Sequence, residues 1–359
     1  MALALGACSL LQTDPVDEAR EAYAAQDYNG ARDLALAALQ ADAGNRDALE
    51  LLAQIQIAMG LGADAIVTLD RLEETGGGPD DAAVIRAEAL LQTGETRDAL
   101  ALLEGKDSAE SWRLRALAAA QAGDHARAAQ AFTNGHDAPG DRRKLFTAEA
   151  SFHLGRGDAN AARRPVGEAQ RLSPGSIETL FVSARLAELD NRPDLASRAY
   201  LAILELAPND RPAMLGAIRE LDKLGRIDLV RQLVQRGLAA YPGDIEFIYF
   251  DASLYAFDGN WQATRDLLQQ HEEAVAAHEN SRGLYGQALL ELGQLEQARA
   301  MIAPLNRRYP DNAAYARVYT RILLRLGEAG QARQVIGRIA SRPQAQNIDR
   351  ELAAQARRS

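Results

Sequence analysis

Cysteine is almost absent from the sequence, since Cys8 is the only one in 359 residues. A single cysteine excludes an internal disulfide and any metal site built from several cysteines of one chain. The five histidines are His125, His136, His153, His271 and His278. None belongs to a His-Glu-x-x-His motif, and His271 and His278 are seven positions apart rather than the four expected of helical metal ligands. We therefore expect surface histidines, no bound metal and no cofactor.

Basic residues are outnumbered, because 40 Lys and Arg face 50 Asp and Glu and the formal net charge is -10. No overall field favours phosphate backbones, so we do not expect nucleic acid as a partner. Beyond the first residues the sequence also lacks any run of about 18 to 20 apolar residues, the length that a membrane-spanning helix needs. Any link to a membrane is therefore expected at the N-terminus.

Catalytic motifs are missing as well. The sequence contains no Gly-x-Ser-x-Gly elbow and no Walker lysine. The glycine-rich stretches GLGAD at Gly60 and GGGP at Gly76 lack the strand-turn-helix context of a phosphate-binding loop. We interpret both stretches as turns and predict that the chain is not an enzyme.

Aromatic residues make up only 5% of a chain that is 47% hydrophobic, and alanine and leucine are abundant. Small side chains suit closely packed helices better than a sheet rich in aromatic and β-branched residues. The composition therefore predicts an all-α protein with a substantial core.

Glycine and alanine recur together at a fixed spacing. Segments such as GETRDAL at Gly94, GDHARAA at Gly123 and GQLEQAR at Gly293 begin with a glycine and carry an alanine five positions later. The full column of these anchor positions is Ala31, Ala65, Ala99, Ala128, Ala162, Ala196, Val230, Thr264, Ala298 and Ala332. Each anchor follows the previous one at the same interval, except for one shorter step between Ala99 and Ala128. Ten units therefore share one register.

Further columns keep the same register. Mostly small residues stand twelve positions before each anchor, at Ala19, Ala53, Ala87, Ala116, Ala150, Ala184, Ile218, Ala252, Gly286 and Thr320. The glycine before each anchor predicts a turn between two helices, because a positive φ costs glycine little. Gln26 and Asn191 replace this glycine in two units. The short step predicts a truncated second helix in the third unit and a kink near Lys106.

This pattern resembles the tetratricopeptide repeat, a helix-turn-helix unit of about 34 residues. The resemblance implies a right-handed α-solenoid of about ten tetratricopeptide repeats with a C-terminal capping helix. We assign residues 12–345 to the solenoid, with the shortened join near residues 103–110. Residues 346–359 carry charges on most helix faces, which is typical of the polar cap that an open solenoid end requires.

The resemblance also implies a concave groove that binds a protein or peptide segment. The residues fifteen and eleven positions before each anchor are four apart, so they share one helix face. In the N-terminal third these two columns are mixed or acidic, whereas units six to ten offer Phe181, Arg185, Arg219, Tyr249, Arg317 and Arg321. Arginine with aromatic residues is typical of interface hot spots, so this set is predicted to bind an acidic or C-terminal segment. Alternatively, these arginines pair with Glu178, Glu188 and Asp222.

The lone cysteine lies in the sequence Leu5-Gly6-Ala7-Cys8, which resembles the lipobox of bacterial lipoproteins. The resemblance implies that a lipid on Cys8 anchors the protein to a membrane. We therefore interpret residues 1–8 as a signal and anchor and residues 9–15 as a tether. Only seven residues, none of them basic, precede the cysteine, so the sequence predicts a truncated start. Ser9, where an aspartate would follow in an inner-membrane lipoprotein, implies the outer membrane.

Together these features predict a lipid-anchored scaffold on the periplasmic face of the outer membrane. The resemblance to outer-membrane tetratricopeptide lipoproteins implies that it assists an envelope, secretion or exopolysaccharide machine through protein-protein interaction. A soluble cytoplasmic adaptor of the same fold is the first alternative. A glycan-binding or hydrolytic solenoid is the second.

Overall fold

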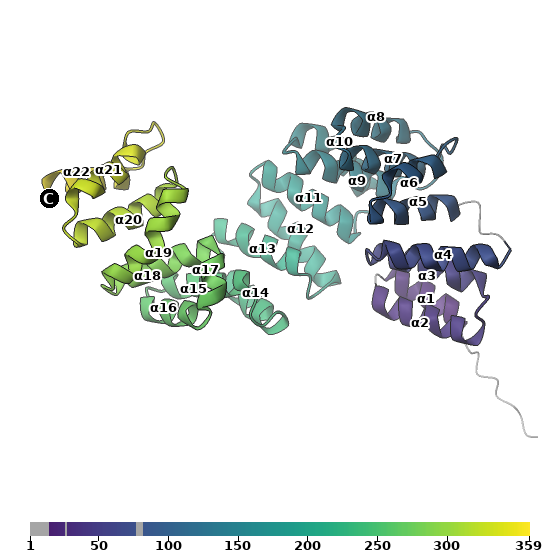
Figure 1. Cartoon of the computed structure of the whole chain (residues 1–359), viewed down its shortest axis with the longest axis horizontal. Coiled ribbons are helices and arrows are strands. Elements are labelled where there is room, and N and C mark those ends of the chain that lie inside the picture. The colour runs from purple at the N-terminus through teal and green to yellow at the C-terminus, as the bar shows by residue number, and fades with distance from the viewer. Residues whose placement is uncertain (1–13, 26, 77–81) are drawn as a thin grey trace, which may run out of the picture. The chain divides into compact units, whose positions relative to one another are not determined.

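The computed structural model describes residues 14–25, 27–76 and 82–359. Those residues form twenty-two helices and no strand, which confirms the all-α prediction (Figure 1). Twenty of these helices form the ten stacked helix-turn-helix units of an α-solenoid. A short extra helix lies between the eighth and ninth units, and one more helix follows the tenth. Cys8, the segment assigned to the signal and Gln26 all lie outside the described residues.

The chain divides into two compact units, of which the N-terminal one comprises residues 1–182. Its first helices are α1 (Pro15–Ala24), α3 (Arg46–Ala58), α5 (Ala82–Thr93), α7 (Ala109–Gln121) and α9 (Arg143–Gly155). Its second helices are α2 (Tyr28–Ala41), α4 (Gly62–Glu74), α6 (Thr96–Leu102), α8 (His125–Gly135) and α10 (Ala159–Leu172). The next helix, α11 (Ile177–Leu189), contains the boundary between the two units.

The C-terminal unit comprises residues 183–359. It begins with the end of α11, the first helix of the sixth repeat. The first helices of the following repeats are α13 (Arg211–Lys223), α15 (Ile245–Phe257), α18 (Glu279–Glu291) and α20 (Ala313–Arg325). Its second helices are α12 (Pro193–Leu206), α14 (Ile227–Ala240), α16 (Trp261–Gln270), α19 (Leu295–Arg308) and α21 (Ala329–Ala340). The short helix α17 (Glu272–Ala277) follows α16, and α22 (Asn347–Arg358) lies at the C-terminal end of the described chain.

The turns between paired helices follow the glycine column. The eight predicted turn glycines all have a positive φ, between 66° at Gly225 and 85° at Gly94. In the sixth unit Asn191 takes the position with a φ of 53°. Asparagine tolerates this left-handed conformation better than most residues with a side chain. The same turn geometry is therefore kept where glycine is lost.

The two columns of small residues form the contacts within the units. All ten anchors are buried, nine of them with no exposed surface and Val230 with 3%. The column twelve positions earlier is buried as well. Thr264, a polar residue among the anchors, is accommodated because its hydroxyl donates to the backbone oxygen of Asn260 at 3.0 Å. These facts confirm the predicted register through all ten units.

The short step between the third and fourth anchors has the predicted origin. Helix α6, the second helix of the third unit, has 7 residues, whereas the equivalent helix α4 has 13. The missing residues therefore come from the second helix. The kink near Lys106 stays a prediction.

The expectation that all histidines lie at the surface is wrong for His136. Its side chain is 6% exposed, and its Nε2 lies 2.7 Å from Oε2 of the buried Glu149. Its ring also stacks on Phe146, with centroids 5.3 Å apart. A buried polar group is tolerated when it has a hydrogen-bond partner, and the carboxylate supplies one. His136 caps the end of α8 whereas Glu149 lies in α9, so the sequence carries no local signal of this pair.

Candidate partner-binding site

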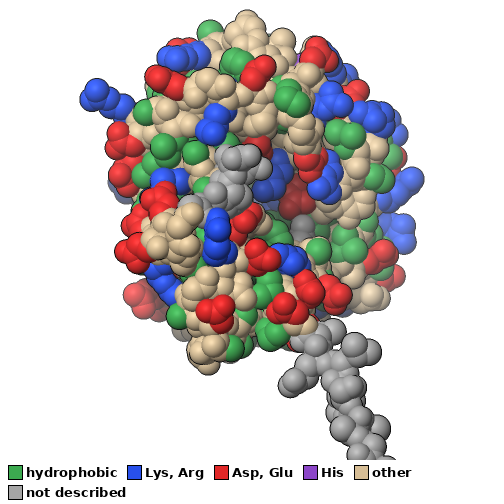
Figure 2. Space-filling view, turned by 90° about the vertical axis from the view of Figure 1, so that its right-hand side faces the viewer, with side chains coloured by type: hydrophobic (Ala, Val, Ile, Leu, Met, Phe, Trp, Pro, Cys, Tyr) green, Lys and Arg blue, Asp and Glu red, His purple; other side chains and the backbone are tan. Residues whose placement is uncertain are grey.

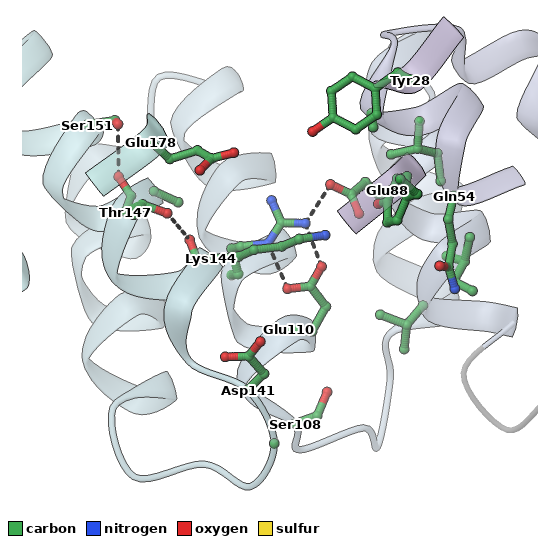
Figure 3. A pocket seen from close by; sticks show the side chains of 18 of the residues that line it. Tyr28, Gln54, Glu88, Ser108, Glu110, Asp141, Lys144, Thr147, Ser151 and Glu178 are labelled. Atoms are coloured by element: carbon green, nitrogen blue, oxygen red, sulfur yellow. Dashed lines mark hydrogen bonds and ion pairs between the residues drawn. The ribbon is translucent and has the colours of Figure 1, made fainter. Parts of the chain in front are cut away.

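A cavity of about 970 Å³ opens in the N-terminal unit. It is lined mainly by the first helices α3, α5, α7 and α9, by the start of α11, and by Tyr23 and Tyr28 of the first unit. Figure 3 shows Tyr28 at one side of the cavity. The two predicted groove columns contribute Glu50, Val84, Arg113, Thr147 and Phe181, and Gln54, Glu88 and Ser151. Eight residues of the two columns therefore line one cavity in this unit.

Arg113 lies at the centre of the polar lining and is only 7% exposed. Its Nε and Nη2 donate to the two carboxylate oxygens of Glu110 at 2.8 and 2.6 Å, and Nη2 also donates to Glu88 at 2.5 Å. Burial alone would raise the pKa of the Glu110 carboxyl, but the hydrogen bonds and charge of Arg113 outweigh it and leave the pKa below its usual value. Arg113 therefore bridges the two carboxyl groups in one cluster of ion pairs.

The start of α7 holds this cluster in place. Ser108 is the N-cap residue, and its Oγ accepts a hydrogen bond from the backbone N–H of Ser111 at 3.1 Å. The cap fixes the first turn, in which Glu110 lies one position before Ser111 and three before Arg113. The first turn of α7 therefore directs the side chains of Glu110 and Arg113 into the same part of the cavity.

The lining carries more negative than positive charge. Its carboxylates are Glu50, Glu88, Glu110, Asp141 and Glu178, whereas its cations are Arg113 and Lys144. Asp141 also pairs with Arg143, which lies outside the lining, at 2.6 Å. Figure 2 shows acidic and basic side chains interspersed over the surface at this end of the chain.

Tyr23 and Tyr28 form an aromatic pair at the edge of the cavity, with ring centroids 5.7 Å apart. Burial raises the pKa of Tyr23, and the carboxylates of Glu88, Glu110 and Glu178 raise it further. The pKa of Tyr28 is raised by burial and then by Glu178. The phenol groups therefore stay neutral and share their surroundings with carboxylates from three other units, and Figure 3 shows Tyr28 and Glu178 pointing into the same space.

The arginines and aromatic residues predicted as a groove in units six to ten come from both compact units. Phe181 belongs to the N-terminal unit and the other five belong to the C-terminal unit. Tyr249 lies edge-on to His278, with ring centroids 5.8 Å apart. Arg185 and Arg219 are both exposed. Burial and Glu188 raise the pKa of Tyr200, and the positive charges of these two arginines partly counteract that rise.

Three of the four predicted groove arginines pair with carboxylates, and of the partners that the alternative interpretation named, Glu188 is among them. Arg185 Nε lies 3.4 Å from Glu188, and Arg321 Nη1 lies 2.8 Å from Glu291. Arg317 makes two hydrogen bonds to Asp349, at 2.6 and 2.9 Å. Asp349 belongs to α22, so this pair joins the last helix to α20. The binding role of all six residues stays a prediction.

In the described parts of the chain, no group of three or more His, Cys, Asp or Glu side chains is arranged to hold a metal ion. None of the described helices combines the length and the apolar character needed to cross a bilayer.

Comparison with known proteins places these features among repeat proteins. The family described as tetratricopeptide repeat matches residues 258–322. Cellulose synthase operon protein C of Pseudomonas fluorescens (strain SBW25) is 27% identical over 191 residues, which cover 51% of this chain but 15% of that protein. The crystal structure of PilW, a type IV pilus biogenesis factor, matches with a TM-score of 0.50 and 16% identity. That match covers 60% of this chain and 99% of PilW.

Proposed function

Since the chain is a tetratricopeptide-repeat protein, we propose that it binds an extended segment of a partner protein in the cavity of its N-terminal unit. The scaffold then holds this partner at the cell envelope. The observation that carries the proposal is the cavity of about 970 Å³ along the first helices of consecutive units. In stacked repeats the surface formed by these helices is the extended face on which partners dock.

The composition of the lining supports a protein ligand. Apolar side chains such as Val84 and Ile85 alternate with charged groups, and Tyr23, Tyr28 and Phe181 supply aromatic surface. Protein interfaces combine an apolar and aromatic centre with polar groups that fix the orientation of the partner. A segment of several residues can therefore bury side chains in the cavity while its backbone stays extended.

The proposed setting is an exopolysaccharide machine of the bacterial envelope. Its support is the similarity to cellulose synthase operon protein C, whose name associates that protein with cellulose synthesis. The match spans only 15% of that relative, so the similarity concerns a part of it and not the whole protein. We propose that the present chain acts there as a non-catalytic periplasmic scaffold, anchored to the outer membrane by a lipid on Cys8.

The proposed lipid anchor on Cys8 gives a direct prediction. In the native host, Cys8 is expected to carry a diacylglyceryl group at the N-terminus of the mature protein, and mass spectrometry of that terminus measures it. The Cys8→Ser variant is expected to move from the membrane fraction to the soluble periplasmic fraction. An unmodified Cys8 in the mature protein would contradict the anchor but leave the binding role of the cavity intact.

The binding role is tested with a photo-reactive amino acid introduced at Thr147, which lines the cavity. Crosslinking in native cells is expected to give one discrete product whose partner belongs to the envelope machine. The matched control is the same amino acid at Gln130, an exposed residue of α8 outside the lining. Products from Gln130 and none from Thr147 would show that the partner uses another surface.

A further inference from the structure

We propose that the exposed face of α22 binds a helix of a partner protein that carries carboxylates along one side. The carboxylates pair with Arg350 and Arg357, and the small residue Ala354 between these arginines lets the two helices approach closely. This inference goes beyond the proposed function, because it concerns the C-terminal unit and does not depend on what the cavity binds.

The position of α22 in the repeat register indicates that the ligand is a helix. Helix α20 begins at Ala313 and α22 begins at Asn347, one period of 34 residues later. Helix α22 therefore takes the place of the first helix of a further unit. It packs against α20 and α21 (Figure 1). Helix α20 also packs against a second helix of its own, α21, whereas none of the described helices takes the corresponding place beside α22.

Helix α20 shows which positions of α22 would contact such a second helix. Ala316, Thr320 and Leu323 of α20 are buried, and the first and last of them share a core cluster with residues of α21. The corresponding residues one period later are Arg350, Ala354 and Arg357. These three share one face of α22, since they are four and three positions apart. The small residue at the closest helix contact is thus kept, whereas arginines replace its apolar neighbours.

The two arginines have no carboxylate partner in the described chain. Both are exposed, and Arg357 forms no ion pair with any described residue. Arg350 donates a hydrogen bond to the amide oxygen of Asn347 at 3.4 Å, which leaves its charge uncompensated. Arg350 also lies near the N-terminus of α22, where the helix dipole disfavours a cation. Helix stability therefore does not explain this residue.

The carboxylates of α22 do not neutralise this face. Asp349 already accepts two hydrogen bonds from Arg317, at 2.6 and 2.9 Å. Glu351 is seven positions before Arg358, so these two share a different stripe of the helix. A polar cap that served only to solvate the end would not need two uncompensated charges of one sign on the remaining stripe.

The surroundings of this face are basic as well. Residues 313–359 contain nine arginines, no lysine and three carboxylates, in a chain whose formal net charge is -10. The planar guanidinium group of arginine forms two parallel hydrogen bonds with a carboxylate. A helix with carboxylates seven positions apart presents them at the spacing of Arg350 and Arg357, because that separation is nearly two turns. Charge and spacing together therefore favour an acidic helix.

The test uses a fluorescein-labelled, hydrocarbon-stapled helix with two glutamates seven positions apart and alanines between them. A control helix of the same composition carries the two glutamates on opposite faces. Fluorescence anisotropy with the full chain is expected to show binding of the first helix and about tenfold weaker binding of the control. A helix with lysines in place of the glutamates is expected to bind only the double variant Arg350→Glu and Arg357→Glu.

Single variants separate the specific site from net charge. Arg350→Gln and Arg357→Gln should each weaken binding about fivefold through the loss of one ion pair. Arg307→Gln removes the same charge from an exposed position of α19 and should change binding less than about twofold. Ala354→Gln adds bulk without charge, so it should weaken binding about tenfold by separating the two helices. Circular dichroism checks that each variant keeps its helicity.

Several results would overturn this inference. If Arg307→Gln weakened binding as much as Arg357→Gln, binding would follow net charge alone. Equal binding of the two acidic helices, or binding unaffected by Ala354→Gln, would indicate a surface for anionic polymers. Self-association of the chain that is lost in Arg357→Gln, measured by sedimentation, would assign the face to a second copy. None of these results changes the crosslinking expected at Thr147, so the proposed function fails or stands separately.

Discussion

Replacement of Arg113 by methionine is expected to lower the free energy of unfolding of the N-terminal unit by about 3 kcal/mol. Methionine keeps much of the volume of the arginine stem but removes the charge that compensates Glu88 and Glu110. Those two carboxylates are only 21% and 29% exposed, so they would face one another with little water to screen them. Urea denaturation followed by circular dichroism measures the change.

The reason for this loss is an uncompensated charge, which a second set of variants can verify. Adding Glu88→Gln and Glu110→Gln to Arg113→Met should recover most of the lost stability, because neutral groups replace the whole ion cluster. Arg127→Met removes an exposed arginine of α8 and should change stability by less than about 0.5 kcal/mol. If the triple variant is no more stable than Arg113→Met, the cost comes from packing and not from charge.

The same cluster predicts a pH dependence. Because the pKa of Glu110 is lowered in the folded protein, its ionised form stabilises the fold at pH values above the unfolded pKa of about 4.3. This contribution is lost as the pH falls through the lower folded pKa. The wild-type unit should therefore lose stability below about pH 4 more steeply than a Glu110→Gln variant, which lacks the titrating group.

Replacement of Asp349 by alanine is expected to reduce the stability of the C-terminal end by about 2 kcal/mol. The Asp349 side chain is 1% exposed and accepts two hydrogen bonds from Arg317. It also accepts a hydrogen bond from the backbone N–H of Gln346 at 2.8 Å, which makes it part of the N-terminal cap of α22. One substitution therefore removes a helix cap and the ion pair that joins α22 to α20.

The effect should be local, because terminal repeats of a solenoid open without the rest. Hydrogen exchange is expected to accelerate in α22 and hardly at all in α13 or α15. Glu351→Ala, an exposed change in the same helix, should leave exchange unaltered. Uniform acceleration across the C-terminal unit would contradict a local role. The hydrogen bonds from Arg317 hold the pKa of Asp349 below its usual value, so acidification through that pKa should also release α22.

The fold was predictable because the requirements of each unit are local. A turn with positive φ needs glycine, and a close helix contact needs a small side chain, so both recur at every period wherever the structure repeats. Asn191 and Thr264 depart from the pattern without changing the structure, since asparagine tolerates the turn and the threonine hydroxyl finds a backbone acceptor. The division of the chain at residue 182 has no counterpart in the periodicity.

The sequence predicted which residues share one helix face, but not where the cavity lies. The register assigned Glu50, Glu88 and Thr147 to one concave surface, and all three line the cavity. It could not indicate where side chains leave space, because that depends on packing between several units. Tyr23, Tyr28, Glu110 and Glu178 lie outside the two columns and were missed as lining residues.

The partners of two predicted groove arginines could have been found in the sequence. Arg317 pairs with Asp349 and Arg321 pairs with Glu291, and in both cases the carboxylate lies close to one repeat period away in the sequence. Comparison of each arginine with acidic residues about one period before and after it would have indicated these pairs. A composition typical of hot spots does not distinguish an arginine that binds another protein from one that forms an ion pair within its own chain.

The helices of the described chain pack chiefly against their next and next-but-one neighbours in sequence. Such a chain has a low contact order, because few of its contacts require distant segments to meet before they form. Folding can therefore nucleate in any unit and spread to the adjacent ones. During synthesis, the N-terminal units can reach their native packing while the ribosome is still adding the last helices.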